Sequence, residues 1–585
     1  MKLLLVDYLA SLKERDELDA MLPDLLTELG YNVISRPRRG TTQRGVDIAA
    51  VRKVDGEERL YLFSVKAGDL TRTEWNGAHL QALRPSLDEI RDSYLNSRVP
   101  PRYKTAKVVI CLVFGGEIRE DIRDQVAGYI TTNTTSRISF EEWNGGRLAD
   151  LLLDGLLREQ VLPEAMRVSF RKAVALVDEP ETAYQHFQDV AAALLAEGQA
   201  NNRARVRSAR QLSLCAWIVF VWARGAGNVE AAYRASELAL LYVWELRRAV
   251  AKPRTVLNAL DLAVHQVADL HIRIASELIE TKLLPLANVP DGLSLAVRSR
   301  YGLDTNLALF DALGRLGLFG LWLNWMAQRA EGEDRARLDA ATRRIADAGL
   351  AMVANNPALW LPVSDDQATD LAIFLQLVLV SQVEGVKLAP WIDQMMLRLV
   401  FTLRRKAGYP TSFSDYRDLV EHPRDDSDAY FKEATTGSTL IPLVGLWARA
   451  LGLSVGLGRL SETVAAQIPD CTQQLWTPDH TSEEHLYRHD APHGYALTDL
   501  PIDATGDTLF QIVSDAAVAK EPQLSGLSVI QAQLWPILLV ACRHHRLPVP
   551  PGFWVQGLAV AQAEDGDICD DAAALETGST PPPDL

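Results

Sequence analysis

Cysteine is scarce in this chain, and its spacing excludes the sites that cysteine usually builds. The 585 residues include five cysteines, which lie far apart at positions 111, 215, 471, 542 and 569. None forms a C-x-x-C pair, so the sequence offers neither a zinc framework nor a disulfide scaffold. A G-x-x-x-x-G-K-[ST] phosphate loop is absent too, which removes support for ATP binding of that type.

Long apolar runs are also missing. The most apolar windows, Leu212 to Ala223 and Leu371 to Val380, are only about half of the roughly 20 residues that a membrane span requires. The opening stretch, Met1 to Val6, is too short for the apolar core of a signal peptide. We therefore expect a cytoplasmic protein with no membrane partner.

An excess of positive charge is absent, which argues against a surface coated with nucleic acid. The formal net charge is -16, but it is unevenly distributed. Residues 1–160 hold 23 Lys+Arg against 25 Asp+Glu, a net charge of -2, and the remainder carries -14. Any contact with nucleic acid is therefore expected in the nearly neutral N-terminal part, where basic residues bunch locally.

The first 160 residues show the alternation of strand and helix patterns that is typical of an α/β domain. Apolar spacing predicts a helix over residues 8–29, ended by Gly30, and later helices over 74–95 and 148–157. Five strands are predicted, with the Asp55-Gly56 turn between the second and the third: Tyr31–Ser35, Val46–Val54, Arg59–Val65, Lys107–Phe114 and Arg137–Phe140. The predicted order is α-β-β-β-α-β-(α)-β-α.

After Pro163 the strand patterns nearly vanish and long helical patterns dominate. We expect a large all-α region, an irregular helical array or a solenoid-like one, because no repeat of fixed period is found. Residues 161–405 form its first part, and 406–563 form a helical C-terminal part with a long loop over 409–436. Residues 564–585 are acidic and end in a proline run, which predicts a disordered tail.

One group of residues in the N-terminal domain carries a recognisable chemistry. Gly45-Val46-Asp47 opens one predicted strand, and Ser64-Val65-Lys66 ends the next. Since side chains alternate along a strand, Ser64 and Lys66 point to one face while Val65 points into the core. A carboxylate beside a lysine suits metal-assisted hydrolysis of a phosphodiester: the carboxylate holds a hard cation, and the lysine positions water or offsets negative charge.

These residues resemble the PD-(D/E)xK (restriction endonuclease-like) nuclease superfamily, and within it the Mrr-like branch. Leu18-Asp19 stands where that branch has Phe-Glu, and Leu29-Gly30-Tyr31 follows at matching spacing. The resemblance covers about a quarter of the chain. It implies that Asp47 binds Mg²⁺ or Mn²⁺, that Lys66 is the catalytic lysine, and that Asp19 assists the metal or the water.

Ser64 departs from the family pattern, which has Glu, Asp or Gln at this position. A serine hydroxyl is a poorer ligand for Mg²⁺ than a carboxylate. The site would then bind metal weakly, use the Val65 carbonyl, or borrow another acid, for which Asp69, Glu74 and Glu17 are the candidates. The remaining alternative is a decayed site that only binds.

Basic residues gather just before Asp47. Arg36, Arg38, Arg39 and Arg44 lie in a segment that Pro37 and Gly40 keep out of regular structure. Beside an active site such a segment is suited to hold the phosphate backbone without reading its sequence; the alternative is a solvated basic loop. Gln81, on the following helix, is a further residue that could face the site.

Two other motifs are weighed and set aside. His480, His485, His489 and His493 crowd one stretch, and the second and third would share a helical face, but Thr481 to Glu484 is typical of a helix start with a capping box. Gly452 to Gly456 matches the G-x-S-x-G pattern around Ser454, yet the preceding residues favour a helix and not the strand that a hydrolase requires. We interpret it as a helix-ending glycine turn.

The sequence thus supports two hypotheses. The first is a Mg²⁺- or Mn²⁺-dependent endonuclease, with DNA favoured over RNA as substrate, whose helical region senses a signal or partner, as in bacterial restriction and anti-phage defence effectors. The second is a catalytically decayed nuclease fold that serves as a scaffold for nucleic acid or protein. Either allows a protein partner or a homo-oligomer through the helical region.

Overall fold

The computed structural model describes residues 5–6, 9–10, 12, 18–35, 44–77, 82–155, 164–382 and 385–558. The chain divides into two compact units, Met1–Leu270 and His271–Leu585, which are described separately. This division was not predicted. The domain boundaries expected near residues 160 and 405 stay predictions, and the basic residues 36, 38 and 39, Gln81, Glu17 and the C-terminal tail lie outside the described residues.

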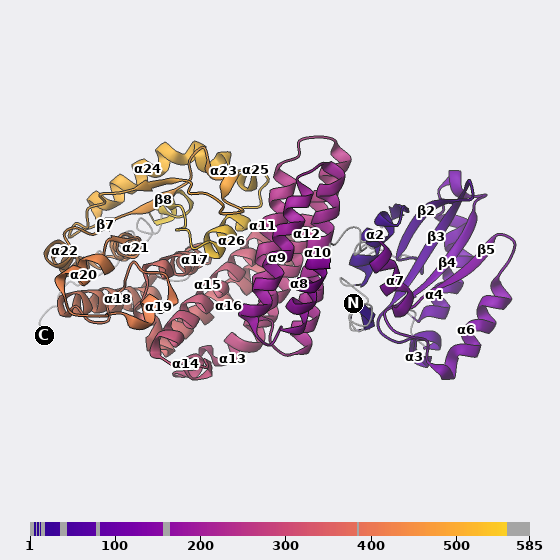
Figure 1. The fold of residues 1–585 in the computed structure, drawn as a ribbon, viewed down its shortest axis with the longest axis horizontal. Coiled ribbons are helices and arrows are strands. Elements are labelled where there is room, and N and C mark those ends of the chain that lie inside the picture. The colour runs from indigo at the N-terminus through magenta and orange to yellow at the C-terminus, as the bar shows by residue number, and fades with distance from the viewer. Residues whose placement is uncertain are drawn as a thin grey trace, which may run out of the picture. The chain divides into compact units, whose positions relative to one another are not determined.

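A five-stranded mixed sheet forms the N-terminal part of the first unit (Figure 1). The strands lie in the order β1-β2-β3-β4-β5, where β1, β2 and β3 are antiparallel neighbours and β4 and β5 run parallel to β3. Their bounds are Asn32–Ser35, Ile48–Val54, Glu57–Lys66, Lys107–Phe114 and Ile138–Trp143. The predicted α/β layout is confirmed, with each strand found within three residues of its expected limits.

Helices lie before, between and after these strands. They are α2 (Asp19–Glu28), α3 (Arg72–Asn76), α4 (Leu83–Glu89) with its continuation η2 (Ile90–Tyr94), α5 (Leu95–Ser97), η3 (Pro101–Tyr103), α6 (Glu120–Asn133) and α7 (Gly145–Gly155). Helix α2 is shorter than the helix expected over residues 8–29, and residues 13–17 lie outside the described part.

The alternation along β3 separates the two faces of the sheet. Leu60 and Leu62 point into a core shared with α4 and α6. Tyr61 and Phe63 point to the other face, where the Phe63 ring meets Trp143 edge-on at 5.1 Å between centroids. Helices α2 and α7 contact each other and the outer strands, so each face of the sheet has its own apolar cover.

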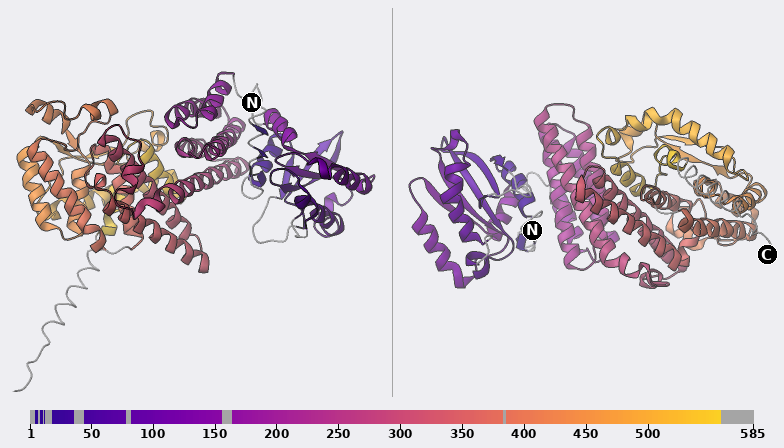
Figure 2. Two further views of the ribbon diagram at one scale, coloured as in Figure 1. Left: turned by 90° about the horizontal axis from the view of Figure 1, so that it is seen from below. Right: turned by 180° about the vertical axis from the view of Figure 1, so that it is seen from behind.

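Four long helices of the first unit pack side by side (Figures 1 and 2). They are α8 (Glu164–Ala175), α9 (Pro180–Gly198), α10 (Asn202–Gly225) and α11 (Glu230–Arg248). Helix α12 (Arg254–Leu278) runs across the division at Leu270. The predicted change from α/β to all-α is therefore confirmed as a coarse layout.

The second unit is mainly helical. Its helices are η4 (Ile279–Leu283), α13 (Leu284–Ala287), α14 (Gly292–Ala296), α15 (Gly302–Ala327), α16 (Gly332–Asn355), η5 (Pro357–Trp360), η6 (Asp365–Gln367), α17 (Ala368–Val380), α18 (Gly385–Arg405), α19 (Tyr416–Glu421), α20 (Asp428–Ala434), α21 (Leu440–Ala450), α22 (Ser454–Gln467), α23 (Ser482–His485), α24 (Asp507–Gly526), α25 (Ser528–Gln531), α26 (Pro536–His544) and η7 (Pro551–Phe553). Short strands pair as β6 (Gly437–Ser438) with β7 (Thr472–Gln473), and β8 (Leu475–Thr477) with β9 (Tyr495–Leu497).

Two features of this unit correct or extend the predictions. The long loop expected over 409–436 contains α19 and α20, whose first turns are capped by Asp415 and Ser427. Helix α15 is long and apolar enough to cross a membrane by length and composition, but 78% of its most apolar window is buried inside the protein. Its packing against α16, α17 and α26 accounts for that composition.

Candidate functional site

The segment that leads into β2 passes unusually close to α4. Gly45 has a φ of +77°, and a Cβ atom built on it would lie 2.1 Å from the backbone oxygen of Ser86. Both the backbone conformation and the missing space require glycine at this position. The glycine of the Gly-Val-Asp motif is therefore explained by packing, and the contact fixes where Asp47 enters the sheet.

Asp47 lies at the start of β2 with its carboxylate bound to the neighbouring strand. Its Oδ2 atom accepts a hydrogen bond from the backbone N–H of Val65 at 2.8 Å, and its own N–H donates to the Phe63 carbonyl at 2.9 Å. A bond from an N–H to a carboxylate is charge-assisted and stronger than a neutral one. The carboxylate is therefore held at the end of β3, beside the residue between Ser64 and Lys66.

Ser64 and Lys66 lie on the face of β3 that also carries Leu60 and Leu62, while Val65 is fully buried on the other face. This is the orientation expected from the sequence. The exposed fractions of the two side chains are 1% for Ser64 and 4% for Lys66. A lysine is almost never so deeply buried on an ordinary surface strand. Lys66 is therefore not a surface lysine, although it is the last residue of β3.

Parallel strands β3 and β4 end side by side at this edge. Lys66 pairs with Phe114 in the register of the two strands, and the loops that follow are joined by the bond from the Gly116 N–H to the Gly68 carbonyl at 2.8 Å. In open sheets the carboxyl edge of parallel strands is the usual place for a ligand site. Asp47, Ser64 and Lys66 thus meet at an edge suited to binding.

The other candidate acids differ in their surroundings. Asp69 forms an ion pair with Arg119 at 3.1 Å and accepts the Glu117 N–H at 3.0 Å, so its carboxylate joins the loops after β3 and β4. Glu74 lies half-buried in the short helix α3. Asp19 begins α2, and its Oδ1 atom is shielded from solvent. The carboxylate of Asp69 is therefore already engaged in a structural contact.

Arg44 is the one basic candidate among Arg36, Arg38, Arg39 and Arg44 that lies within the described residues. Its side chain is half-buried, and its guanidinium donates to the hydroxyl of Ser93 in η2. Its backbone is left-handed, with a φ of 52°. This contact ties the end of the basic segment to the helix beside the site.

The oxygen donors at this edge fit a hard divalent cation in type. Mg²⁺ and Mn²⁺ prefer carboxylate, carbonyl and hydroxyl oxygens, which Asp47, Val65 and Ser64 supply. The N–H and C=O of one strand residue point to the same side, so the Val65 carbonyl leaves β3 on the side of Asp47. Burial raises the pKa of the Cys111 thiol well above its ordinary value, which favours the neutral thiol over the thiolate.

Few carboxylates are available at this edge to bind a metal ion. Within the described ranges, no three His, Cys, Asp or Glu side chains stand close enough together to hold a metal ion. The carboxylate of Asp47 is bound to the Ser64-Val65-Lys66 segment at its middle residue. A cation here would therefore depend on few carboxylates and on weaker oxygen donors.

Sequence reasoning missed the contacts that set the shape of this edge. A Cβ atom on Gly116 would lie 2.2 Å from Asp69 Oδ1, and one on Gly145 would lie 2.2 Å from the Gly115 carbonyl. The Gly115-Gly116 pair directly after a buried strand was a visible signal of a close backbone approach. Which loops approach each other could not be known without the strand order.

Histidines of the second unit form a cluster, although they do not share the helical face that the sequence predicted. Helix α23 ends at His485, and His489 has a φ of 51°, so the two do not share a helix. Ring centroids nevertheless lie 5.8 Å apart for His489 and His493, and 5.1 Å apart for His489 and His545. Burial and the neighbouring imidazoles lower the pKa of His545 to about 3.

Two smaller expectations also have outcomes. The capping box expected at Thr481 does not form; the Asp479 carboxylate instead accepts the Thr481 N–H at 2.8 Å. Ser454 begins α22 directly after a turn in which Gly452 has a φ of +68°, and the element before it is helix α21. The interpretation of this motif as a glycine turn between helices is confirmed.

No protein-family model matches the chain, and neither the curated proteins nor the solved structures contain a significant match to it.

Proposed function

We propose that the N-terminal domain, residues 1–160, is a metal-dependent endonuclease of the PD-(D/E)xK type that hydrolyses phosphodiester bonds in DNA. The observation that carries this proposal is the bond from the Val65 N–H to Asp47 Oδ2 at 2.8 Å. It holds a carboxylate beside the buried Lys66, at the carboxyl edge of a mixed sheet. A carboxylate and a lysine positioned in this way are suited to hydrolysis of a phosphodiester with a hard cation.

Each residue of the site has a distinct part in the proposed reaction. Asp47 binds the Val65 N–H through its carboxylate and would bind a cation through the same group, while the Val65 carbonyl and the Ser64 hydroxyl offer further oxygens. Bound Mg²⁺ or Mn²⁺ would polarise the phosphate and make its water more acidic. Lys66 offsets the negative charge that develops on the phosphate and orients the attacking water.

Three further assignments rest on the sequence resemblance. Asp19 would assist the metal or the water from the start of α2. Arg36, Arg38, Arg39 and Arg44 would hold the phosphate backbone without reading its sequence. The helical region would recognise a signal or a protein partner, as in bacterial restriction and anti-phage defence effectors; this rests on analogy of architecture alone.

The test is an incubation of the purified full chain with supercoiled plasmid, linear DNA and RNA, with Mg²⁺ or Mn²⁺ and with EDTA. We expect cation-dependent cutting of DNA by the wild type, lowered at least about a hundredfold in Asp47→Asn and in Lys66→Met. Both replacements keep the size of the side chain while removing its charge.

Matched controls come from the other end of the same hairpin. Asp55→Asn and Lys53→Met alter an exposed carboxylate and an exposed ammonium of the β2–β3 turn region and should cut like the wild type. Full activity in either site variant would contradict the assigned roles. DNA binding without cutting, unchanged in Asp47→Asn, would instead support the scaffold alternative, which the serine at position 64 and the thin carboxylate set favour.

A further inference from the structure

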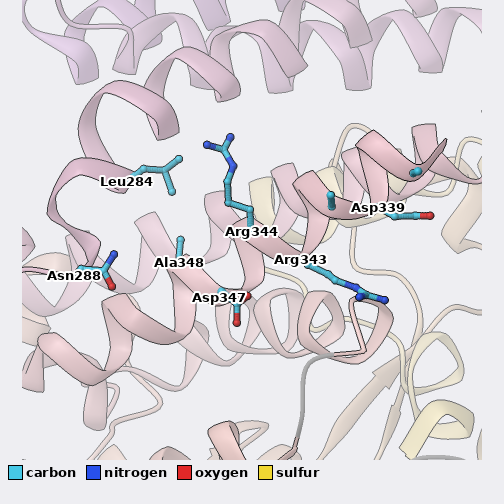
Figure 3. Close-up of a pocket in the computed structure, with 9 residues that line it drawn as sticks. Leu284, Asn288, Asp339, Arg343, Arg344, Asp347 and Ala348 are labelled. Atoms are coloured by element: carbon cyan, nitrogen blue, oxygen red, sulfur yellow. The ribbon is translucent and has the colours of Figure 1, made fainter. Parts of the chain in front are cut away.

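A cavity of about 850 Å³ opens along the exposed side of α16 in the second unit (Figure 3). Leu284 and Asn288 line one side, and Asp339, Arg343 and Asp347 of α16 line the other. Small-molecule sites are walled mainly by apolar and aromatic side chains. Five of the nine residues that line this cavity are charged or carry an amide, and none is aromatic, which suits the surface of another protein.

The charges on this side of α16 alternate in sign at a regular spacing. Arg335, Asp339, Arg343 and Asp347 follow one another four residues apart, so they lie along one ridge of the helix. Their side chains are well exposed to solvent. We call these four residues the charge ladder of α16.

Three charges of the ladder have exposed partners within the chain: Arg335 pairs with Asp339 at 3.8 Å, and Asp347 pairs with Lys387 at 3.3 Å. Exposed ion pairs of this kind contribute little to stability, so they do not prevent these charges from pairing with another surface.

Arg344 is turned toward η4 and pairs with Glu280 at 2.8 Å, whereas Figure 3 shows Arg343 pointing to a different side of α16. No partner of the Arg343 guanidinium is found in the part of the chain that the structure describes. Ala336 and Ala340, beside the ladder, are exposed and small enough to allow another helix to approach closely.

The order of the ladder is complementary to itself. When two such helices run antiparallel about a two-fold axis at Ala341, Asp339 faces the partner's Arg343 and Arg335 faces the partner's Asp347. Each of the four pairs made by the two copies then joins opposite charges. A surface that contacts its own copy across a two-fold axis needs this property.

We propose that the α16 surface, the charge ladder with the cavity beside it, is a docking surface for a second copy of this chain. The complementarity of the ladder with its own image selects a second copy over an unrelated protein. Charges arranged in this way set the register of an interface and suppress wrong partners. The proposal does not depend on the nuclease activity, and Asp47→Asn should dimerise like the wild type.

Sedimentation equilibrium of the full chain at low and high salt is the test. We expect a dimer for the wild type, weakened by salt because the ladder charges are exposed. Arg343→Asp and Asp339→Arg should each weaken the dimer at least about tenfold, since each places like charges opposite one another. An equimolar mixture of these two variants should dimerise again, because their ladders are complementary to each other and not to themselves.

The mixing experiment separates an interface from an effect on folding, since misfolded chains would not restore each other. Arg337→Asp is the matched control: this exposed arginine pairs with Asp334 and lies about 120° around α16 from Arg343. It should dimerise like the wild type. A monomeric wild type, a dimer that neither reversal weakens, or a mixture that stays monomeric would each overturn the proposal.

Discussion

At the scale of single residues, the site depends on contacts that join positions far apart in the chain. The spacing of Asp47, Ser64 and Lys66 was readable, because side-chain alternation along a strand is a local property. The burial of Ser64 and Lys66 was not, since it depends on the neighbouring strand β4 and on the loops beyond it. Local patterns thus indicated the spacing and orientation of these three residues but not the exposed fraction of their side chains.

Gly45 offers a direct test of how the site is positioned. Gly45→Ala adds a methyl group 2.1 Å from the Ser86 oxygen at a φ of +77°, so overpacking and strain should together cost about 2 kcal/mol or more of the free energy of unfolding of this domain. Pulse proteolysis in urea measures that change. Gly56→Ala is the control, because its φ is +84° but no atom lies within 4 Å of the added methyl, so it should cost only about 1 kcal/mol. Equal losses would show that the Ser86 contact is unimportant.

His545 makes the stability of the second unit depend on pH. Its pKa lies at about 3, lowered first by burial and then by the neighbouring imidazoles of the cluster. An unfolded chain binds a proton with a pKa near 6.5, so protonation favours unfolding as the pH falls below that value, and the loss continues until the pH reaches the folded pKa. By pH 5 the loss should reach ~2 kcal/mol.

The measurement is the thermal midpoint of the second unit between pH 7.5 and pH 5, both pH values chosen to bracket the ordinary histidine pKa of about 6.5. His545→Gln should flatten this dependence, even if its midpoint at neutral pH is lower. His480→Gln, which alters an exposed imidazole, should keep the slope of the wild type. An unchanged slope in His545→Gln would refute the assignment.

At the scale of elements, the strands were easier to predict than the boundaries of the helices. The five strands of the sheet are short runs rich in β-branched, aromatic and other apolar residues and are bounded by turn residues, which are local signals. The segment 409–436 was predicted to be a loop, because its Asp, Ser and Pro residues are typical of loops. Asp415 and Ser427 are instead the caps of α19 and α20, and whether such a residue caps a helix or lies in a loop depends on the residues after it.

The crossing of α15 and α17 is an element-scale contact that glycine makes possible. A Cβ atom on Gly317 would lie 2.9 Å from the backbone nitrogen and Cα of Phe374, which cannot move aside as a side-chain tip could. Gly317→Ala should therefore cost about 1–3 kcal/mol through overpacking. Gly302→Ala, in the same helix with nothing within 4 Å, should be neutral or slightly stabilising. Urea unfolding followed by far-ultraviolet circular dichroism compares the two, and a Gly317→Ala protein as stable as Gly302→Ala would disprove the close crossing.

At the scale of the whole molecule, the change from an α/β part to a helical part was predictable, whereas the division into two units was not. The change follows from the loss of strand patterns after Pro163, which the sequence shows directly. The division falls within α12, a continuous helix, so no break in local pattern marks it. The apolar pattern of a helix shows which of its faces is buried. It does not show which other helix covers that face, and the division into units depends on those contacts.

The two units allow the proposed cation site to be tested without any measurement of cutting. Ligand that binds only the folded site stabilises it by mass action, by about 2.7 kcal/mol at a concentration a hundredfold above its Kd. Because the site lies wholly in the first unit, Mn²⁺ should raise the unfolding temperature of that unit and leave the unfolding temperature of the second unit unchanged.

Hydrogen exchange assigns each transition to its unit, and the added protection should concentrate at Asp47 and at the end of β3. Asp47→Asn should abolish the shift and Asp55→Asn should retain it. An equal shift in wild type and Asp47→Asn would place the cation elsewhere, and the absence of any shift would leave the carboxylate edge as a binding surface without a metal.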